Sequence, residues 1–134
     1  MSADEDKRKH LDFIQLTITR MGANSFLLKG WTVTIVAAIF ALTDKSRDSR
    51  FIYVVLLPTI VFWVLDGYYL SIERLFRKLY DAVANDKDNV PRYSMDYSAF
   101  SKDDKTWLRA TFAKSELLFY VPVMLLSIIW LLMK

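Results

Sequence analysis

The apolar residues of this chain fall in three blocks, and nearly all the charge lies outside them. The blocks are 26–42, 51–70 and 117–133, which are 17, 20 and 17 residues long. A hydrocarbon core about 30 Å thick takes roughly 17 to 25 helical residues, so each block is long enough to span it. A soluble helix bundle is the alternative, but it would spread its apolar positions over amphipathic stretches. We therefore expect an all-α membrane protein, with residues 1–134 forming one membrane domain.

The first two blocks belong to longer helical patterns. A heptad rhythm runs through the first block and back toward the N-terminus, and a second one continues past the second block. The positions are Leu11, Ile14, Ile18, Met21, Ser25, Leu28, Thr32, Ile35 and Ile39, and then Tyr69, Ile72, Phe76, Leu79 and Val83. These rhythms predict long helices over 6–43 and 50–85. We expect the two to form an antiparallel hairpin whose charged ends make a coiled-coil-like stalk.

The remainder of the chain divides into a loop and a third helical segment. Pro91 cannot continue a helix, so residues 86–101 are expected to be a loop. Ser101 followed by Asp104 is typical of a helix start. The pattern predicts an amphipathic helix within 102–133 that leads into the third span. The amphipathic part either lies at the membrane surface or extends the span into the cytoplasm.

The distribution of Lys and Arg predicts the orientation. Nine of these residues lie between the second and third blocks, and three lie between the first and second. Cytoplasmic segments carry the excess of positive charge, so the N-terminus and the stalk should face the cytoplasm and Lys134 the outside. The polar first ten residues predict insertion without a cleaved signal peptide. This topology also accounts for the net charge of +3, so no nucleic-acid partner is expected.

Two ionisable residues lie within the predicted spans. Lys29 and Asp66 are almost equally far from the turn that joins the first two blocks, so an antiparallel hairpin places them level with each other. An isolated charge in the bilayer costs several kcal/mol, and an opposite charge at the same depth relieves much of that cost. Glu116 is a candidate third member of this cluster. A structural ion pair, snorkelling of Lys29 to the interface and a role in ion or proton passage remain alternatives.

Two further sets of residues follow from the same register. Arg20 is expected beside Glu73 and Arg74, which would continue the charge pairing down the stalk. Small and polar residues also give the first helix a side that either packs against other helices or lines a wet lumen. The candidates for a pore lining are Asn24, Ser25, Thr32 and Thr34.

The chain lacks the residues that most catalytic sites require. The chain has one histidine, His10, and no cysteine, which excludes a metal site built on several histidines, a thiolate metal site and a disulfide within one chain. There is no glycine-rich phosphate loop. We expect neither an enzyme nor a cofactor or metal.

Three short segments carry a family resemblance. Residues 24–31 read NSFLLKGW, and the motifs DGYYL at 66–70 and ERLFR at 73–77 follow. Over roughly residues 8 to 80 this layout resembles the RipA-like octameric membrane proteins of the bacterial inner membrane. It is also similar to small membrane effectors encoded beside anti-phage systems. The resemblance implies a homo-oligomer and pore formation in antiviral defence. The octameric proteins of this family imply a ring of eight. The resemblance transfers no functional residue.

Two functions are compatible with these observations. Three spans bury little surface in one protomer, and small membrane chains commonly assemble symmetrically. The leading hypothesis is a homo-oligomeric pore or channel-like effector in the lipid bilayer. The alternative is a membrane-anchored scaffold or sensor that binds a cytoplasmic protein through its stalk and does not conduct. A transporter is less favoured, because a chain this short lacks the usual repeat pair.

Overall fold

The computed structural model describes residues 2–43, 48, 50–102 and 105–133. Helices dominate this part of the chain, and it contains no strands. The elements are α1 (Ala3–Leu42), α2 (Phe51–Ala84), the short 3-10 helix η1 (Ser98–Phe100), α3 (Thr106–Thr111) and α4 (Lys114–Leu132). Three of them, α1, α2 and α4, are long and apolar enough to cross a membrane.

The two long helices have the expected extent, and α1 begins three residues earlier than predicted. Its N-terminus is a capping box, in which the Ser2 hydroxyl accepts from the Glu5 amide and the Glu5 carboxylate accepts from the Ser2 amide. This exchange satisfies two backbone donors that would otherwise lack a partner at a helix end. With 40 residues α1 is roughly 60 Å long, about twice the thickness of a hydrocarbon core.

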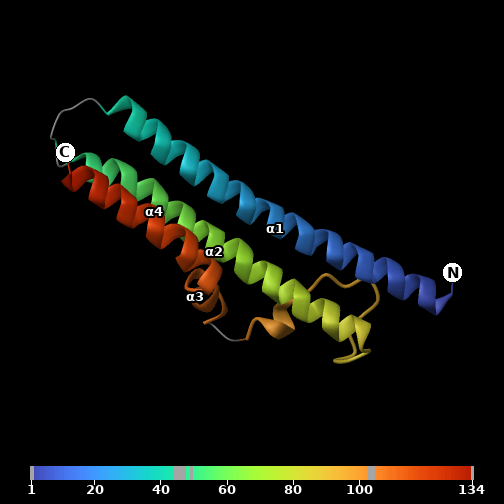
Figure 1. The fold of residues 1–134 in the computed structure, drawn as a ribbon. Coiled ribbons are helices and arrows are strands. Elements are labelled where there is room, and N and C mark those ends of the chain that lie inside the picture. Colours follow the sequence, from blue (N-terminus) through green and yellow to red (C-terminus); the bar gives the residue numbers. More distant parts are fainter. Residues whose placement is uncertain (1, 44–47, 49, 103–104, 134) are drawn as a thin grey trace.

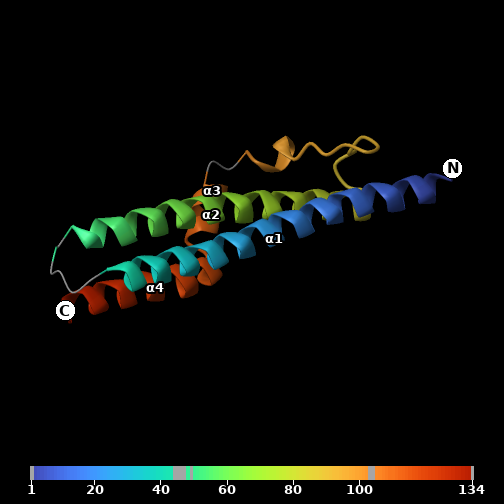
Figure 2. The same ribbon diagram turned by 90° about the horizontal axis from the view of Figure 1, so that it is seen from above.

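The helices α1 and α2 lie side by side and run in opposite directions (Figures 1 and 2). The much shorter α4 lies along one end of the pair and packs mainly on α2. The charged half of the molecule, made of residues 3–22, 70–84 and 85–101, therefore extends beyond α4.

A compact apolar core holds the charged half together. Ile14 and Ile18 of α1 pack against Phe76, Leu79 and Val83 of α2, and both Ile14 and Leu79 are fully buried. The loop after α2 folds back over this core, because Val90, Met95, Tyr97 and Phe100 pack on it. The heptad positions at 14, 18, 76, 79 and 83 are thus buried between the two helices.

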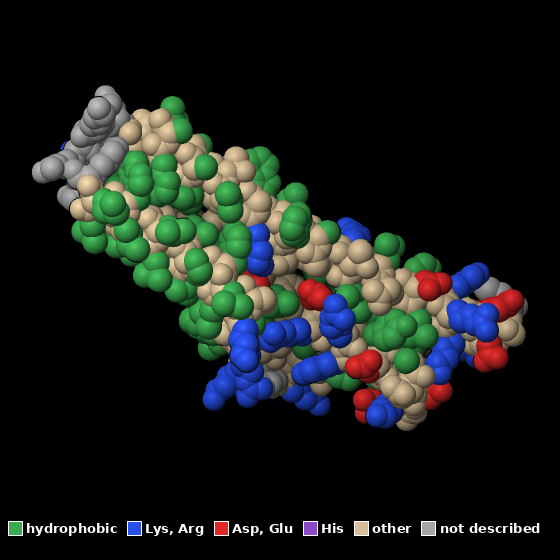
Figure 3. Space-filling view, in the orientation of Figure 1, with side chains coloured by type: hydrophobic (Ala, Val, Ile, Leu, Met, Phe, Trp, Pro, Cys, Tyr) green, Lys and Arg blue, Asp and Glu red, His purple; other side chains and the backbone are tan. Residues whose placement is uncertain are grey.

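The half that contains α4 is apolar on its outside. Only 11%, 22% and 17% of the most apolar stretches of α1, α2 and α4 are buried within the chain. A soluble bundle would bury these faces, so the low burial favours a membrane as their surroundings. Figure 3 shows the same division: hydrophobic side chains cover this half, and Lys, Arg, Asp and Glu gather on the other.

The third helical segment is interrupted between its amphipathic part, α3, and the apolar helix α4. α3 ends at Thr111, and Ala113 is extended before α4 begins. The break lets α3 press against α2 at Gly67, where Thr111 occupies the space that a side chain would need. The Trp63 indole then donates to the Thr111 carbonyl at 2.8 Å. The predicted start at Ser101 and Asp104 lies partly outside the described residues.

The contact at Gly67 leads to a first prediction. A Cβ there would lie 2.2 Å from Thr111 Oγ1 and 2.7 Å from Thr111 Cα. The Thr111 hydroxyl can rotate away but its backbone cannot, so Gly67→Ala must displace α3. Overpacking of this kind costs about 1 to 3 kcal/mol. We expect limited trypsin digestion at Arg109 of α3 to become faster in Gly67→Ala.

The matched control is Gly22→Ala, whose Cβ would meet only Glu73 Oε2 at 3.9 Å, an ordinary contact. It should digest like the unmodified protein. Equal digestion of both variants would show that α3 does not depend on the Gly67 contact.

Candidate functional site: a buried ion cluster

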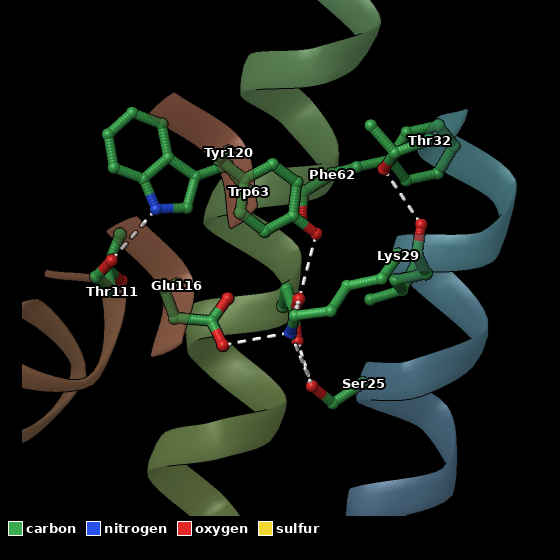
Figure 4. Close-up of polar contacts among 10 residues, drawn as sticks. Ser25, Lys29, Thr32, Phe62, Trp63, Thr111, Glu116 and Tyr120 are labelled. Carbon is green, nitrogen blue, oxygen red and sulfur yellow. Dashed lines mark hydrogen bonds and ion pairs between the residues drawn. The ribbon is translucent and has the colours of Figure 1, made fainter. Parts of the chain in front are cut away.

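Lys29, Asp66 and Glu116 come from three different helices and meet at one point (Figure 4). Lys29 is on α1, Asp66 is on α2 and Glu116 is in the first turn of α4. The structure therefore brings together all three residues that were expected to form the intramembrane cluster. We call these three residues, with Ser25 and Tyr120, the ion cluster.

The ammonium group of Lys29 is at its centre. Lys29 Nζ donates to Asp66 Oδ2, to Glu116 Oε1 at 2.9 Å and to Ser25 Oγ at 3.1 Å. An ammonium has three N–H donors, so this arrangement uses every one of them. Its side chain is 20% exposed, which leaves one edge of the cluster open. Lys29 is therefore ion-paired within the chain rather than extended to the interface.

Asp66 is enclosed by donors. It is fully buried, and besides Lys29 it accepts from the Ser25 hydroxyl and, at 2.8 Å, from the Tyr120 hydroxyl. An ionised carboxylate only accepts hydrogen bonds, so three donors suit the charged form.

Glu116 is less well satisfied. It is 1% exposed, and its Oε1 accepts from Lys29. The second oxygen, Oε2, is buried and has no hydrogen-bond partner among the described residues. The cluster thus contains one cationic side chain and two acidic ones.

Aromatic rings pack against the cluster on one side. Lys29 Nζ lies 5.8 Å from the ring centroids of both Phe119 and Tyr120, within the range of a cation–π contact. Trp63 stacks on Tyr120 with centroids 6.0 Å apart and an interplanar angle of 12°. These apolar walls strengthen the charge interactions inside and make any unpaired charge expensive.

The expected pairing of Arg20 with Glu73 and Arg74 is not what the structure has. Glu73 instead accepts from Arg77 of its own helix, at 2.7 Å. Arg77 is four residues further along, which places it on the same helix face without any need for register between helices. Arg20 and Arg74 are both exposed.

The four candidates for a pore lining do not share one face of α1. Ser25 belongs to the ion cluster, and Thr32 is 1% exposed and bonded to the Leu28 carbonyl. Thr34 is exposed and donates to the Gly30 carbonyl, whereas Asn24 is half-buried. Ser25 and Thr32 therefore lie inside the protomer, and Thr34 points outward.

No sequence pattern pointed to Tyr120, although its hydroxyl is the third donor to the Asp66 carboxylate. A tyrosine in an apolar helix most often contributes to packing. Its hydroxyl indicates a polar site only when a buried acceptor lies within hydrogen-bond distance. Its position four residues after Glu116, on the same face of α4, is the one signal that could have identified it. Across the described residues, no group of His, Cys, Asp and Glu side chains could hold a metal ion.

A second polar feature lies at the end of the charged half. A cavity of about 400 Å³ is lined by residues from the start of α1, the end of α2 and the loop that follows, among them Asp6, Lys7, His10, Lys87, Arg92 and Tyr93. The hydrogen bond from the Tyr93 hydroxyl to Asp6, 2.8 Å long, raises the pKa of this tyrosine. His10 Nε2 lies 2.7 Å from the Ser94 carbonyl oxygen. These contacts attach the loop to α1.

Comparison with known proteins found no matching family model, no matching curated protein and no matching solved structure. The site must therefore be understood from its own geometry.

The ion cluster leads to a second prediction. Lys29→Met removes the only cation and leaves two acids in an apolar environment, which typically costs about 3 to 5 kcal/mol. We expect that loss in detergent unfolding followed by tryptophan fluorescence. Lys78→Met, the same change at an exposed lysine of α2, serves as the control and should be nearly neutral.

Adding Asp66→Asn to Lys29→Met should recover part of the stability, because one unpaired charge is then removed. Strictly additive effects of the two changes would contradict an interaction between Lys29 and Asp66.

Proposed function

We propose that this chain is the subunit of a homo-oligomeric, pore-forming effector of the bacterial inner membrane. One observation carries the proposal: α1 has a second heptad face, opposite the one that packs within the protomer. Its positions alternate in steps of four and three, and every one of them is exposed. They are Leu16, Arg20, Ala23, Leu27, Gly30, Thr34, Ala37 and Ala41, and we call them the outer α1 face.

The composition of this face favours a second copy of the chain as its partner. Its membrane part consists largely of small residues, which let helix backbones approach closely. A Cβ at Gly30 would meet no atom within 4 Å, so the space beside it is open to another helix. Leu16 is 59% exposed and lies ten residues before the first apolar block. Lipid would not cover Leu16 there, whereas a neighbouring α1 would.

The position of the ion cluster supports a pore between protomers rather than through one. Ser25, Thr32 and the three charged residues make their polar contacts within one copy of the chain, and only the edge at Lys29 is partly exposed. Any water-filled path would therefore run along the interface between copies, where Thr34 is the exposed hydroxyl of the outer α1 face. The resemblance to RipA-like proteins suggests a ring of eight.

Orientation follows from charge. In this proposal the N-terminus and the charged half stand in the cytoplasm as a hairpin stalk, and the end of α4 faces outward. A stalk of this kind could receive the signal that opens the pore.

The cavity at the end of the charged half favours one alternative, a membrane-anchored sensor or scaffold. It is lined by both acidic and basic side chains and lies far from the spans along α1. In that case it would bind a cytoplasmic partner, and the membrane part would only anchor the chain.

A third prediction tests the outer α1 face. Gly30→Trp should block close approach of two α1 helices and convert the oligomer to smaller species, as judged by light scattering of the detergent-solubilised protein. The matched control is Val33→Trp, the same substitution at an exposed position of α1 that lies off this face. The control should keep the oligomer.

Conduction is tested with the same two variants reconstituted in planar bilayers. We expect current from the unmodified protein and from Val33→Trp, and none from Gly30→Trp. An intact oligomer that never passes current would contradict the pore and favour the sensor.

A fourth prediction concerns topology. Reporter fusions within residues 1–20 and 75–110 should read as cytoplasmic, and a fusion after residue 134 should read as external, because positive charge is retained on the cytoplasmic side. A cytoplasmic reading at the C-terminus would mean that α4 does not cross the membrane.

A further inference from the structure

The charges of the ion cluster do not balance. Lys29 contributes one positive charge, and Asp66 and Glu116 would contribute two negative charges if both were ionised. Among the residues that the structure describes, Glu116 Oε2 is the one buried side-chain oxygen or nitrogen without a hydrogen-bond partner. The excess negative charge and the unsatisfied oxygen thus belong to the same residue.

Among the described residues, Lys29 is the one cation that is paired with Glu116. Lys29 of α1 has already given one N–H to Glu116 and two to other acceptors. The Tyr120 hydroxyl donates to Asp66 rather than to Glu116. The buried residues of α3 are Ala110 and Thr111, neither of which titrates. Asp66 of α2 is itself acidic and adds repulsion.

Protonation of one carboxyl removes the imbalance, and the hydrogen bonds indicate which one. Asp66 accepts from three donors, an arrangement that favours the ionised form. Glu116 accepts from one donor and has a bare oxygen in an apolar pocket, which favours the neutral form. A neutral Glu116 still accepts from Lys29 through its carbonyl oxygen.

We propose that Glu116 is a proton-binding site, occupied at neutral pH, whose proton keeps α4 docked against α1. When the proton leaves Glu116 Oε2, it passes to water at the exposed edge of Lys29. The cluster then carries a net negative charge that its apolar walls cannot solvate, and the Lys29–Glu116 contact between α1 and α4 must open to water. The proposal concerns one protomer and does not rest on the pore.

The proton can be detected directly by infrared spectroscopy of the full chain in phosphatidylcholine nanodiscs. The chain has three glutamates: Glu5, Glu73 and Glu116. Glu5 accepts from the Ser2 amide at an exposed helix end and Glu73 accepts from Arg77, so neither resembles Glu116 with its buried, unpartnered oxygen. We expect a carboxylic acid C=O band at neutral pH that shifts when glutamate alone is labelled with ¹³C, and that disappears on alkalinisation.

Two results would overturn the proposal without any variant. Absence of the band at neutral pH would mean that Glu116 is ionised, and an unshifted band would place the proton on an aspartate. The spectra are repeated with sodium chloride and with choline chloride. A band that sodium alone removes would make the site a cation site rather than a proton site.

The structural consequence is tested with Glu116→Gln, which imitates the protonated form, and Glu73→Gln as the matched control. Because the chain lacks cysteine, spin labels can be placed at Phe26 of α1 and Leu118 of α4, both of which are exposed. Labelled chains are diluted with unlabelled ones to remove distances between copies. The distance should increase on alkalinisation in the parent protein and in Glu73→Gln but not in Glu116→Gln. A pH response that persists in Glu116→Gln would contradict the proposal.

Discussion

The arrangement of α1, α2 and α4 depends on the hydrogen bonds of the Lys29 ammonium group. Its three N–H donors reach α2 through Asp66, α4 through Glu116 and α1 itself through Ser25. Apolar helices in a bilayer gain little from hydrophobic association, because lipid is as apolar as their own side chains. A polar contact shared by three helices therefore determines how they meet. The Phe40–Trp130 ring contact, 4.5 Å between centroids, adds a second link between α1 and α4.

The segment of α2 that contains Asp66 also positions α3. Asp66 joins the ion cluster, and the next residue, Gly67, admits Thr111 of α3 at a distance that no side chain would allow. Trp63 connects these two contacts, because its ring stacks on Tyr120 and its N–H binds the Thr111 carbonyl. A continuous set of contacts thus runs from α3 to α1.

The sequence was sufficient for some of these features and not for others. The meeting of Lys29 and Asp66 followed from their equal distances from one turn, and the three apolar helices followed from block length. The Arg20–Glu73 pairing was wrong because a partner four residues away in the same helix was available. The break before α4 accompanies a close contact of Thr111 with Gly67, which no local pattern reveals. The shared face assigned to the pore lining was a different error, since Thr32 and Thr34 are about 200° apart on any α-helix.

The angle between Thr32 and Thr34 also explains the two faces of α1. Once Lys29 is directed to the interior, its heptad neighbours Ser25 and Thr32 must follow it, and Gly30 and Thr34 must turn outward. A helix rotates as a rigid body, so the ion cluster also sets the direction of the outer α1 face. In the proposed oligomer, assembly between copies and ion pairing within one copy would then both depend on the same rotation. If Glu116 loses its proton and α4 moves away, α1 loses one of the contacts that hold this rotation, and the proposed interface between copies would change with it.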